Sequence, residues 1–415
     1  MVYRHRKALL SVLVLATIVS YCAVGLCAEP ELVLDGVCEA AMDIPRISFV
    51  LKREPNGPVM GVADEFSYNY AFLDTGASGV LLSRQSASEM KLAVEPNAAF
   101  VDVGIGGEEY FDVSQPVYIG LGDFEQTGSP ERTAYKILGP GRIQVRRSDA
   151  AMMGEAIDVI GMPVMAGKIF VLDSGATNEG GFFAASIKER GDRSIPKSDI
   201  IIALRFENFL NTANPKNKGP LPSLSFNPVI DNVVTSYGGN SSKGNWLLDT
   251  GATVSLISTE QAQKLGLINK EGTPLAKQAF SLPMGGVGAT VQVPGFEIDK
   301  LIVPAVSGGN LVFRKARIGV HDIKYFNEKT GKFATLDGVF GSNFLCASAK
   351  LEGFLPENIM AMMFKNDASW DIDIRETVFD KVVLDMETGQ MGLDVKNRHG
   401  VPAPTKSYKK SGDDN

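Results

Sequence analysis

The 415-residue chain has few of the side chains on which most hydrolytic mechanisms depend. It contains three histidines and four cysteines, and one of the histidines, His5, lies in an N-terminal leader. Of the other two, His321 stands in an alternating stretch that favours a packing or surface position. No Gly-x-Ser-x-Gly or His-Glu-x-x-His segment is present. These absences argue against Ser-His, Cys-His and zinc mechanisms, and we expect no metal or other cofactor.

Positive charge is in the minority, and no basic stripe stands out. Lys and Arg number 41 against 48 Asp and Glu, and this balance argues against a nucleic-acid surface. An apolar content of 44% with 21% charged residues is that of a globular protein. We therefore expect a folded body, and its length is sufficient for two domains.

The first 28 residues carry a short basic segment, Arg4 to Lys7, followed by an apolar run that ends in small residues. This layout is typical of a secretory signal peptide. The alternative is a membrane anchor over residues 8–28, because the run is about as long as a spanning helix. Both interpretations place the body outside the cytosol, secreted or periplasmic, with no other membrane contact.

Cysteine is scarce outside that leader, where only Cys38 and Cys346 remain. A secretory compartment permits a disulfide between them. Two free buried thiols fit the sequence as well, because spacing along the chain says nothing about geometry.

The rest of the chain passes through the same landmarks twice. The first landmark is an alternating stretch with a proline, residues 44–49 and 221–226, which suits a strand. The second is Asp-Thr-Gly-Ala, which begins at Asp74 and again at Asp249. Nine residues beyond each aspartate stands a serine, Ser83 or Ser258, that we expect to cap a short helix.

Glycine landmarks complete each repeat. Each half has a cluster of the kind that turns a hairpin tightly, and then two apolar residues followed by Gly161 or Gly341. Short alternating stretches dominate both halves. We predict an all-β fold of two similar β-barrel-like lobes related by a pseudo-twofold axis, with few short helices. The hairpin clusters comprise Gly104, Gly106 and Gly107 in the first half and Gly285, Gly286 and Gly288 in the second.

These landmarks also give the expected domain order. A signal peptide (1–28) and an N-terminal segment (29–43) precede an N-terminal lobe over residues 44–210. Residues 211–220 are rich in Asn, Lys, Pro and Gly and are predicted to be a linker. The C-terminal lobe follows over residues 221–396, and the polar stretch 397–415 is predicted to be a disordered tail.

A single Asp-Thr-Gly segment is an ordinary turn, because the Asp side chain bonds nearby backbone and Gly accepts a positive φ. Two copies at matching places of a duplicated fold are different, since a pseudo-twofold axis would bring Asp74 and Asp249 face to face. Two carboxyls about 3 Å apart do not both ionise easily, so they share a proton. The unprotonated member can then accept a proton from water while the protonated member polarises a carbonyl.

With these motifs the sequence resembles the pepsin and retropepsin superfamily of aspartic peptidases, over roughly Ile44 to Val395. In that family each lobe or subunit supplies one Asp-Thr/Ser-Gly and one apolar-apolar-Gly segment. The resemblance implies a catalytic pair at the interface between the lobes. The residues that it assigns are Asp74 and Asp249 as the pair, Thr75, Gly76, Thr250 and Gly251 as its support, and Gly161 and Gly341 as structural glycines beside it.

Two details resemble retropepsins more than pepsin. Alanine follows both copies of Asp-Thr-Gly, and both glycine clusters are flap candidates. Pepsin-like enzymes usually have one flap with a tyrosine near its tip. Tyr110, three residues after Gly107, fits that role, but a hairpin tyrosine packed for structural reasons fits the sequence at least as well.

A third segment, Leu172-Asp173-Ser174-Gly175, matches the motif as closely as the other two. The repeat offers another account of it, because Leu172-Asp173 follows Gly161 as Leu384-Asp385 follows Gly341. We therefore interpret Asp173 as part of a hairpin turn, and the pairing of Asp173 with Asp249 is the alternative to test.

The resemblance implies an aspartic endopeptidase that acts as a monomer on a protein or peptide substrate. The alternative is a catalytically silent relative that binds a peptide or protein in the same cleft. Intact aspartates and threonines in both halves favour the enzyme, because binding alone would not require them.

Overall fold

The computed structural model describes residues 31–35, 44–61, 70–122, 135–147, 158–173, 183–328, 330–345, 371–374, 379–395 and 406–409. Strands make up most of this structure and the helices are few and short, so the predicted all-β class is confirmed. Within these ranges no helix is both long enough and apolar enough to cross a bilayer. The predicted signal peptide and the cysteines at 38 and 346 lie outside the described residues.

The elements follow the chain as below. The strands up to the end of the linker are β1 (Leu32–Asp35), β2 (Pro45–Lys52), β3 (Tyr70–Leu73), β4 (Leu81–Leu82), β5 (Phe100–Gly104), β6 (Gly107–Val113), β7 (Val117–Gly122), β8 (Lys136–Gly141), β9 (Gln144–Arg146), β10 (Val159–Ile160), β11 (Ile169–Asp173), β12 (Phe183–Lys188), β13 (Ile200–Ala203) and β14 (Arg205–Glu207). Those after it are β15 (Asn227–Tyr237), β16 (Asn240–Leu248), β17 (Leu256–Ile257), β18 (Gln278–Met284), β19 (Val291–Val303), β20 (Leu311–Val320), β21 (Lys324–Asn327), β22 (Lys332–Thr335), β23 (Gly338–Phe340), β24 (Asp371–Ile374), β25 (Phe379–Asp385), β26 (Gln390–Val395) and β27 (Lys406–Lys409). The helices are α2 (Arg84–Glu89), α3 (Met162–Met165), α4 (Thr259–Leu265) and α5 (Ser342–Leu345).

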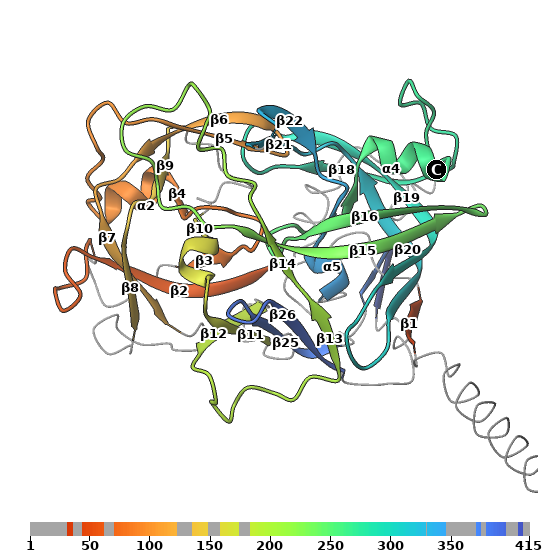
Figure 1. Ribbon diagram of the computed structural model, residues 1–415, viewed down its shortest axis with the longest axis horizontal. Coiled ribbons are helices and arrows are strands. Elements are labelled where there is room, and N and C mark those ends of the chain that lie inside the picture. Colours follow the sequence, from red (N-terminus) through yellow and green to blue (C-terminus); the bar gives the residue numbers. More distant parts are fainter. Residues whose placement is uncertain are drawn as a thin grey trace, which may run out of the picture.

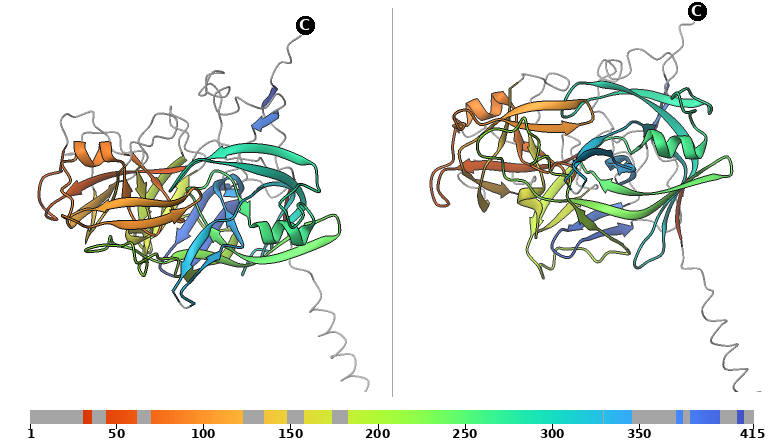
Figure 2. Two further views of the ribbon diagram at one scale, coloured as in Figure 1. Left: turned by 90° about the horizontal axis from the view of Figure 1, so that it is seen from above. Right: turned by 45° about the horizontal axis from the view of Figure 1, so that its top comes forward.

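Two lobes lie side by side, one built mainly from the first half of the chain and one from the second (Figures 1 and 2). The first lobe belongs to a 14-stranded sheet and the second to a nine-stranded sheet. Both contribute to one continuous apolar core, which includes Phe49 from β2 and Trp246 from β16, each at most 1% exposed. The burial of such large side chains supplies the driving force that holds the lobes together.

The strand register fixes which residues of the two halves correspond. Arg46 of β2 pairs with Phe72 of β3, and Val229 of β15 pairs with Leu247 of β16. The partner in each pair lies two residues before a motif aspartate, so Pro45 corresponds to Pro228. The prediction that residues 221–226 are the matching strand is wrong. Apart from a single bridge between Leu224 and Gly79, that segment is irregular, and the strand begins at Asn227.

The lobes exchange strands, which the predicted domain boundaries did not foresee. Strand β1 comes from the predicted N-terminal segment and pairs in parallel with β20 of the second half. Strands β25 and β26 come from the predicted C-terminal lobe but join the sheet of the first, where β25 pairs with β11 (lower centre of Figure 1). Four residues of the predicted tail form β27, which pairs with β24.

Helices α2 and α4 occupy matching places, and both predicted caps are confirmed. The hydroxyl of Ser83 accepts a hydrogen bond from the amide of Ser86, and the hydroxyl of Ser258 accepts one from the amide of Gln261. These bonds satisfy backbone donors that have no partner within the helix.

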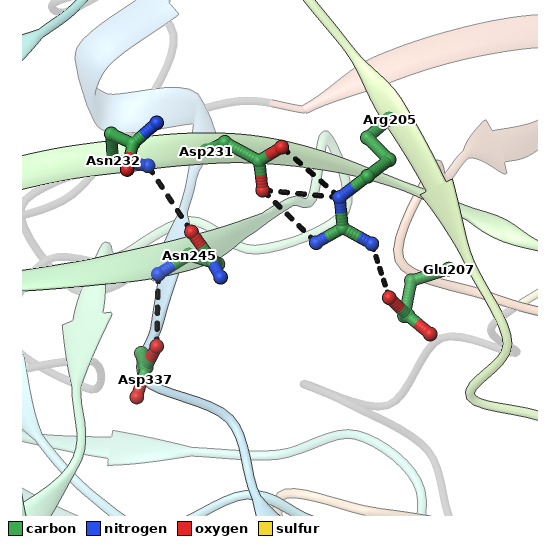
Figure 3. A network of polar contacts seen from close by, with 6 residues as sticks. All are labelled: Arg205, Glu207, Asp231, Asn232, Asn245 and Asp337. Atoms are coloured by element: carbon green, nitrogen blue, oxygen red, sulfur yellow. Dashed lines mark hydrogen bonds and ion pairs between the residues drawn. The ribbon is translucent and has the colours of Figure 1, made fainter.

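A bulge in β15 carries a surface network of polar contacts (Figure 3). Asn232 has a left-handed φ of 64°, and its amide donates to Oδ1 of Asn245 at 3.2 Å. The guanidinium of Arg205 on β14 binds Asp231 through Nε and Nη2, at 3.0 and 2.9 Å. This network fastens β14 to the first strand of the second lobe.

Candidate active site

The two motif aspartates stand at equivalent strand ends. Asp74 follows β3 and Asp249 follows β16. The amide of Asp74 donates to the carbonyl of Ile160 at 3.0 Å, and the amide of Asp249 donates to that of Phe340 at 3.0 Å. The backbone of each aspartate is therefore held by the apolar strand that precedes Gly161 or Gly341.

Those two glycines are required by close backbone approach. A Cβ added at Gly161 would lie 2.0 Å from the carbonyl oxygen of Gly79, and one added at Gly341 would lie 2.8 Å from that of Ala252. Since both contacts are with the loop that follows a motif aspartate, the glycines let the strand pack against that loop. The structure thus places both predicted glycines beside the aspartates.

Thr75 and Thr250 join the two loops across the interface. The hydroxyl of Thr75 donates to the Leu248 carbonyl at 2.6 Å and accepts from the amide of Thr250 at 3.1 Å. The hydroxyl of Thr250 donates to the Leu73 carbonyl at 2.5 Å and accepts from the amide of Thr75 at 3.1 Å. Both threonines are fully buried, so these four bonds fix the loops relative to each other without competition from water.

The structure brings the carboxyl groups of Asp74 and Asp249 into hydrogen-bonding contact. Oδ1 of Asp74 accepts from the amides of Gly76 (2.7 Å) and Ala77 (3.0 Å). Oδ1 of Asp249 accepts from the amides of the corresponding Gly251 and Ala252, both at 2.9 Å. Both side chains are half-buried, so the pair is held rigidly but is not sealed from a small molecule.

The glycines of the two motifs pack across the interface. A Cβ at Gly76 would lie 2.4 Å from Cγ of Asp249, and one at Gly251 would lie 2.5 Å from Cγ of Asp74. Any larger residue would push the carboxylates apart. This contact explains why both motifs carry glycine after threonine.

Burial raises the pKa of both carboxyls, and the charge of Asp74 raises that of Asp249 further. Burial raises the pKa of Asp74, while hydrogen bonds from Asp249 and nearby amides oppose the rise. Burial is also the largest cause of the shift at Asp249. The charge of Asp74 and the hydrogen bond to Asp74 add to it, so the pKa of Asp249 lies well above its ordinary value. The pair therefore titrates as a unit and retains one proton above the pH at which isolated carboxyls ionise.

The support of the two loops is not symmetric, and sequence reasoning missed the residues responsible. The loop of Asp74 is supported by Asn227, the fully buried first residue of β15. Its Nδ2 donates to the carbonyls of Thr75 (3.0 Å) and Gly76 (2.9 Å). In the second lobe, the hydroxyl of Ser342 donates to the carbonyl of Thr250 at 2.7 Å. Asn227 immediately precedes Pro228, so a correct alignment of the repeat could have drawn attention to it.

Both glycine clusters form hairpins, and their tips meet. The first flap is β5 and β6, and the second is β18 with the start of β19. The amide of Gly106 donates to the Val287 carbonyl (3.0 Å), and the amide of Ala289 donates to the Gly106 carbonyl (3.1 Å). A Cβ at Gly106 would lie 1.9 Å from the Ala289 oxygen, and Gly288 has a φ of 91°. Glycine is therefore needed for this tip-to-tip contact.

Each flap tip packs on the opposite lobe. Ile105 from the first flap contacts the second-lobe cluster that contains Val254 and Leu256. Val287 from the second flap contacts the first-lobe cluster of Phe100 and Phe111. The predicted linker also lies against the first flap, because Ala99 and Lys218 exchange two backbone hydrogen bonds of 2.8 Å.

Two predicted candidates lie elsewhere. Tyr110 is 43% exposed and pairs with Val101 on the face of β6 opposite to Glu109, so it does not point beneath the flap. Asp173 ends β11 in the sheet shared by the lobes, and its carboxylate forms an ion pair with Lys381 at 3.4 Å. The hydrogen-bonded pair is therefore Asp74 with Asp249. The described ranges contain no group of His, Cys, Asp and Glu suited to a metal ion.

No protein-family model matches the chain, and no curated protein matches it by sequence. Among solved structures, the crystal structure of basic 7S globulin from soybean is similar at 8% identity, with a TM-score of 0.40. That likeness covers 86% of this chain and 98% of the soybean chain. The function of the chain has to be inferred from its own residues.

Proposed function

We propose that the protein is an aspartic endopeptidase whose catalytic pair is Asp74 and Asp249. The observation that carries the proposal is the contact between these two carboxyls, which are half-buried, bonded to each other and raised in pKa. Two carboxyls that share one proton provide an acid and a base in the same site. The substrate class is a peptide or protein, and one chain supplies both carboxyls, so a monomer suffices.

The pair performs acid and base steps in turn. The unprotonated carboxyl takes a proton from a water molecule as that water attacks the peptide carbonyl, while the protonated carboxyl donates to the carbonyl oxygen. A tetrahedral intermediate forms. It collapses when the carboxyl that took the proton from water passes it to the leaving nitrogen as the C–N bond breaks, while the other carboxyl takes a proton back from a hydroxyl of the intermediate. The products are a carboxylic acid and an amine, and the pair again holds one proton. Neither carboxyl forms a covalent bond with the substrate.

The surrounding residues supply position rather than chemistry. Amide donors at Gly76, Ala77, Gly251 and Ala252 orient one oxygen of each carboxyl, and the threonine bonds hold the two loops at fixed separation. The flaps, joined at their tips, are the elements that would close over a bound peptide and limit access of bulk water.

The proposal is tested by cleavage of a denatured protein between pH 3 and 7, with and without pepstatin. Asp74→Asn and Asp249→Asn should each lower turnover at least a hundredfold, because each removes one partner of the acid–base pair. Asp173→Asn is the matched control, since it changes the third motif aspartate, and its turnover should stay within about twofold of the parent.

Activity that survives in Asp74→Asn and Asp249→Asn would contradict the proposal. Peptide binding without cleavage by the parent protein, unchanged in both variants, would instead identify a binding protein. Loss of activity in Asp173→Asn alone would point to the other pairing.

A further inference from the structure

The inner faces of the two flaps differ in polarity at equivalent positions. In the first flap Asp102 pairs with Glu109, two residues before Gly104 and two after Gly107. In the second flap Met284 pairs with Val291. The bridge between Gly106 and Gly288 aligns the two tips. Counted along the chain from the bridged glycine, the members of the two pairs stand at the same positions. Two carboxylates therefore occupy the places that two apolar side chains occupy in the other lobe.

The face that carries Asp102 looks toward the loop of Asp74. Phe100 and Phe111 lie on the same face and pack on Leu81, in the strand that follows this loop. The side chain of Gln144 lies close enough to Asp102 to lower its pKa, and the amide nitrogen of Gln144 would lie 2.5 Å from a Cβ at Gly79. Asp102 thus lies on the face of the first flap that packs, through Phe100 and Phe111, on the strand after the Asp74 loop.

Asp102 is the carboxylate of this pair that is not held in an ion pair within the described ranges, and its Oδ1 accepts from the amide of Val103 at 2.9 Å. Glu109 binds Arg146 at 3.3 Å and accepts from the amide of Gly288 at 3.0 Å. No ion pair of Asp102 occurs among the described residues. The three charged groups on this face, from β5, β6 and β9, therefore carry a net charge of about −1 when all are ionised.

The environment of Asp102 favours a positive partner. Burial, with a smaller contribution from the charge of Glu109, raises the pKa of Asp102 to about 6. A cation placed beside it would offset both effects. At the equivalent place in the other lobe, Met284 is 9% exposed and lies in an apolar cluster with Val254 and Leu256, which disfavours a cation.

We propose that Asp102 determines specificity, such that the cleft beneath the first flap accepts a Lys or Arg side chain of the substrate and the cleft beneath the second flap accepts an aliphatic one. This inference rests on the proposed peptidase function, because it places the scissile bond between the two pockets. It names the substrate class as peptides that are cationic on one side of that bond and apolar at the matching position on the other.

The experiment compares kcat/KM for a peptide set in which each position near the scissile bond is Lys, Arg, Met or Glu. At pH 6.5 the parent should prefer Lys or Arg over Met about 10-fold to 100-fold at one position, the range expected for a hydrogen bond to a charged group. That ratio should fall toward 1 in Asp102→Asn. It should also fall in the parent as the pH drops from 7 to 5, because Asp102 takes up a proton.

Two further variants make the test specific. Asp112→Asn removes an exposed carboxylate of β6 that pairs with Arg147, and it should leave the ratio unchanged. Met284→Asp should create a preference for Lys at the position on the other side of the scissile bond. Equal cleavage of Lys and Met peptides by the parent, or an unchanged ratio in Asp102→Asn, would overturn the inference.

Failure of the peptidase proposal gives a different result, namely no cleavage of any peptide by the parent. The pocket assignment can then be measured separately by equilibrium binding of the same peptides. Tighter binding of Lys than Met peptides to the parent, lost in Asp102→Asn, would support the pocket, and equal binding would overturn it.

Discussion

Arg146 and His321 occupy equivalent positions in the two lobes, and each holds a backbone carbonyl of the opposite flap. After each motif loop comes a short strand, and its second residue pairs with the residue just before Arg146 or His321. Leu82 pairs with Val145 in the first lobe, and Ile257 pairs with Val320 in the second. Nη2 of Arg146 donates to Gly286 at 2.8 Å, and Nε2 of His321 lies 3.0 Å from the carbonyl oxygen of Ile105. The flap tips are thus held by a side chain of the opposite lobe as well as by each other.

Loss of the arginine contact should loosen the second flap. Arg146→Leu removes the bond to Gly286 and leaves Glu109 without its ion-pair partner. We expect hydrogen exchange at the amides of Gly288 and Ala289 to become about tenfold faster, equivalent to one lost hydrogen bond. Arg147→Leu, which removes an exposed neighbour, is the control. Unchanged exchange in Arg146→Leu would show that the tips hold without this contact.

The threonine cross-links should matter for stability as well as for activity. Thr75→Val keeps the shape of the side chain but leaves the Leu248 carbonyl and the Thr250 amide without their partner. Each unsatisfied buried group costs about 1–3 kcal/mol, so urea unfolding should show a loss of roughly 2–6 kcal/mol for the two groups. Thr75→Ser retains the hydroxyl and should lose less than half as much. Equal losses in both variants would mean that the methyl group contributes as much to stability as the hydroxyl.

The aspartate pair should make stability depend on pH in a definite direction. Both folded-state pKa values are raised, so the folded protein binds more protons than the unfolded chain between the ordinary carboxyl range and the folded pKa. Stability from these groups is therefore lost as the pH rises through that window. Asp249→Asn removes the carboxyl whose pKa is raised most. Its melting temperature relative to the parent should be higher at pH 7 than at pH 4, and the opposite trend would contradict the assigned shifts.

Gly161 should tolerate no side chain, because its added Cβ would meet backbone atoms of the Asp74 loop. Gly161→Ala should lower the free energy of unfolding by more than about 3 kcal/mol, through displacement of that loop. Gly167→Ala separates this effect from backbone strain, since Gly167 has a φ of 69° and its Cβ would meet no atom within 4 Å. That control should cost about 1–2 kcal/mol. Similar losses in the two variants would mean that the loop can move aside.

Much of the fold and of the candidate site follows from the repeat in the sequence. The all-β class, the two helix caps and the two glycine hairpins depend on local patterns, which alternation and turn chemistry reveal. The choice of Asp74 and Asp249 over Asp173 also came from the repeat, because only those two aspartates have a full set of matching landmarks. The first landmark failed in the second half because Leu221 to Phe226 has the pattern of a strand, but among the described residues it forms only a single bridge, with Gly79.

Other features depended on residues far apart in the chain, and only the tertiary structure decided them. Asn227 is an ordinary polar residue in the sequence, and its role arises because the fold buries it against the carbonyls of Thr75 and Gly76. The exchange of β25 and β26 between the sheets cannot be read from alternation, since strand pairing depends on which edges meet. The sequence by itself determined which carboxyls could act as a pair. The fold decided that they touch, and that one flap carries a pair of carboxylates at the positions where the other carries two apolar side chains.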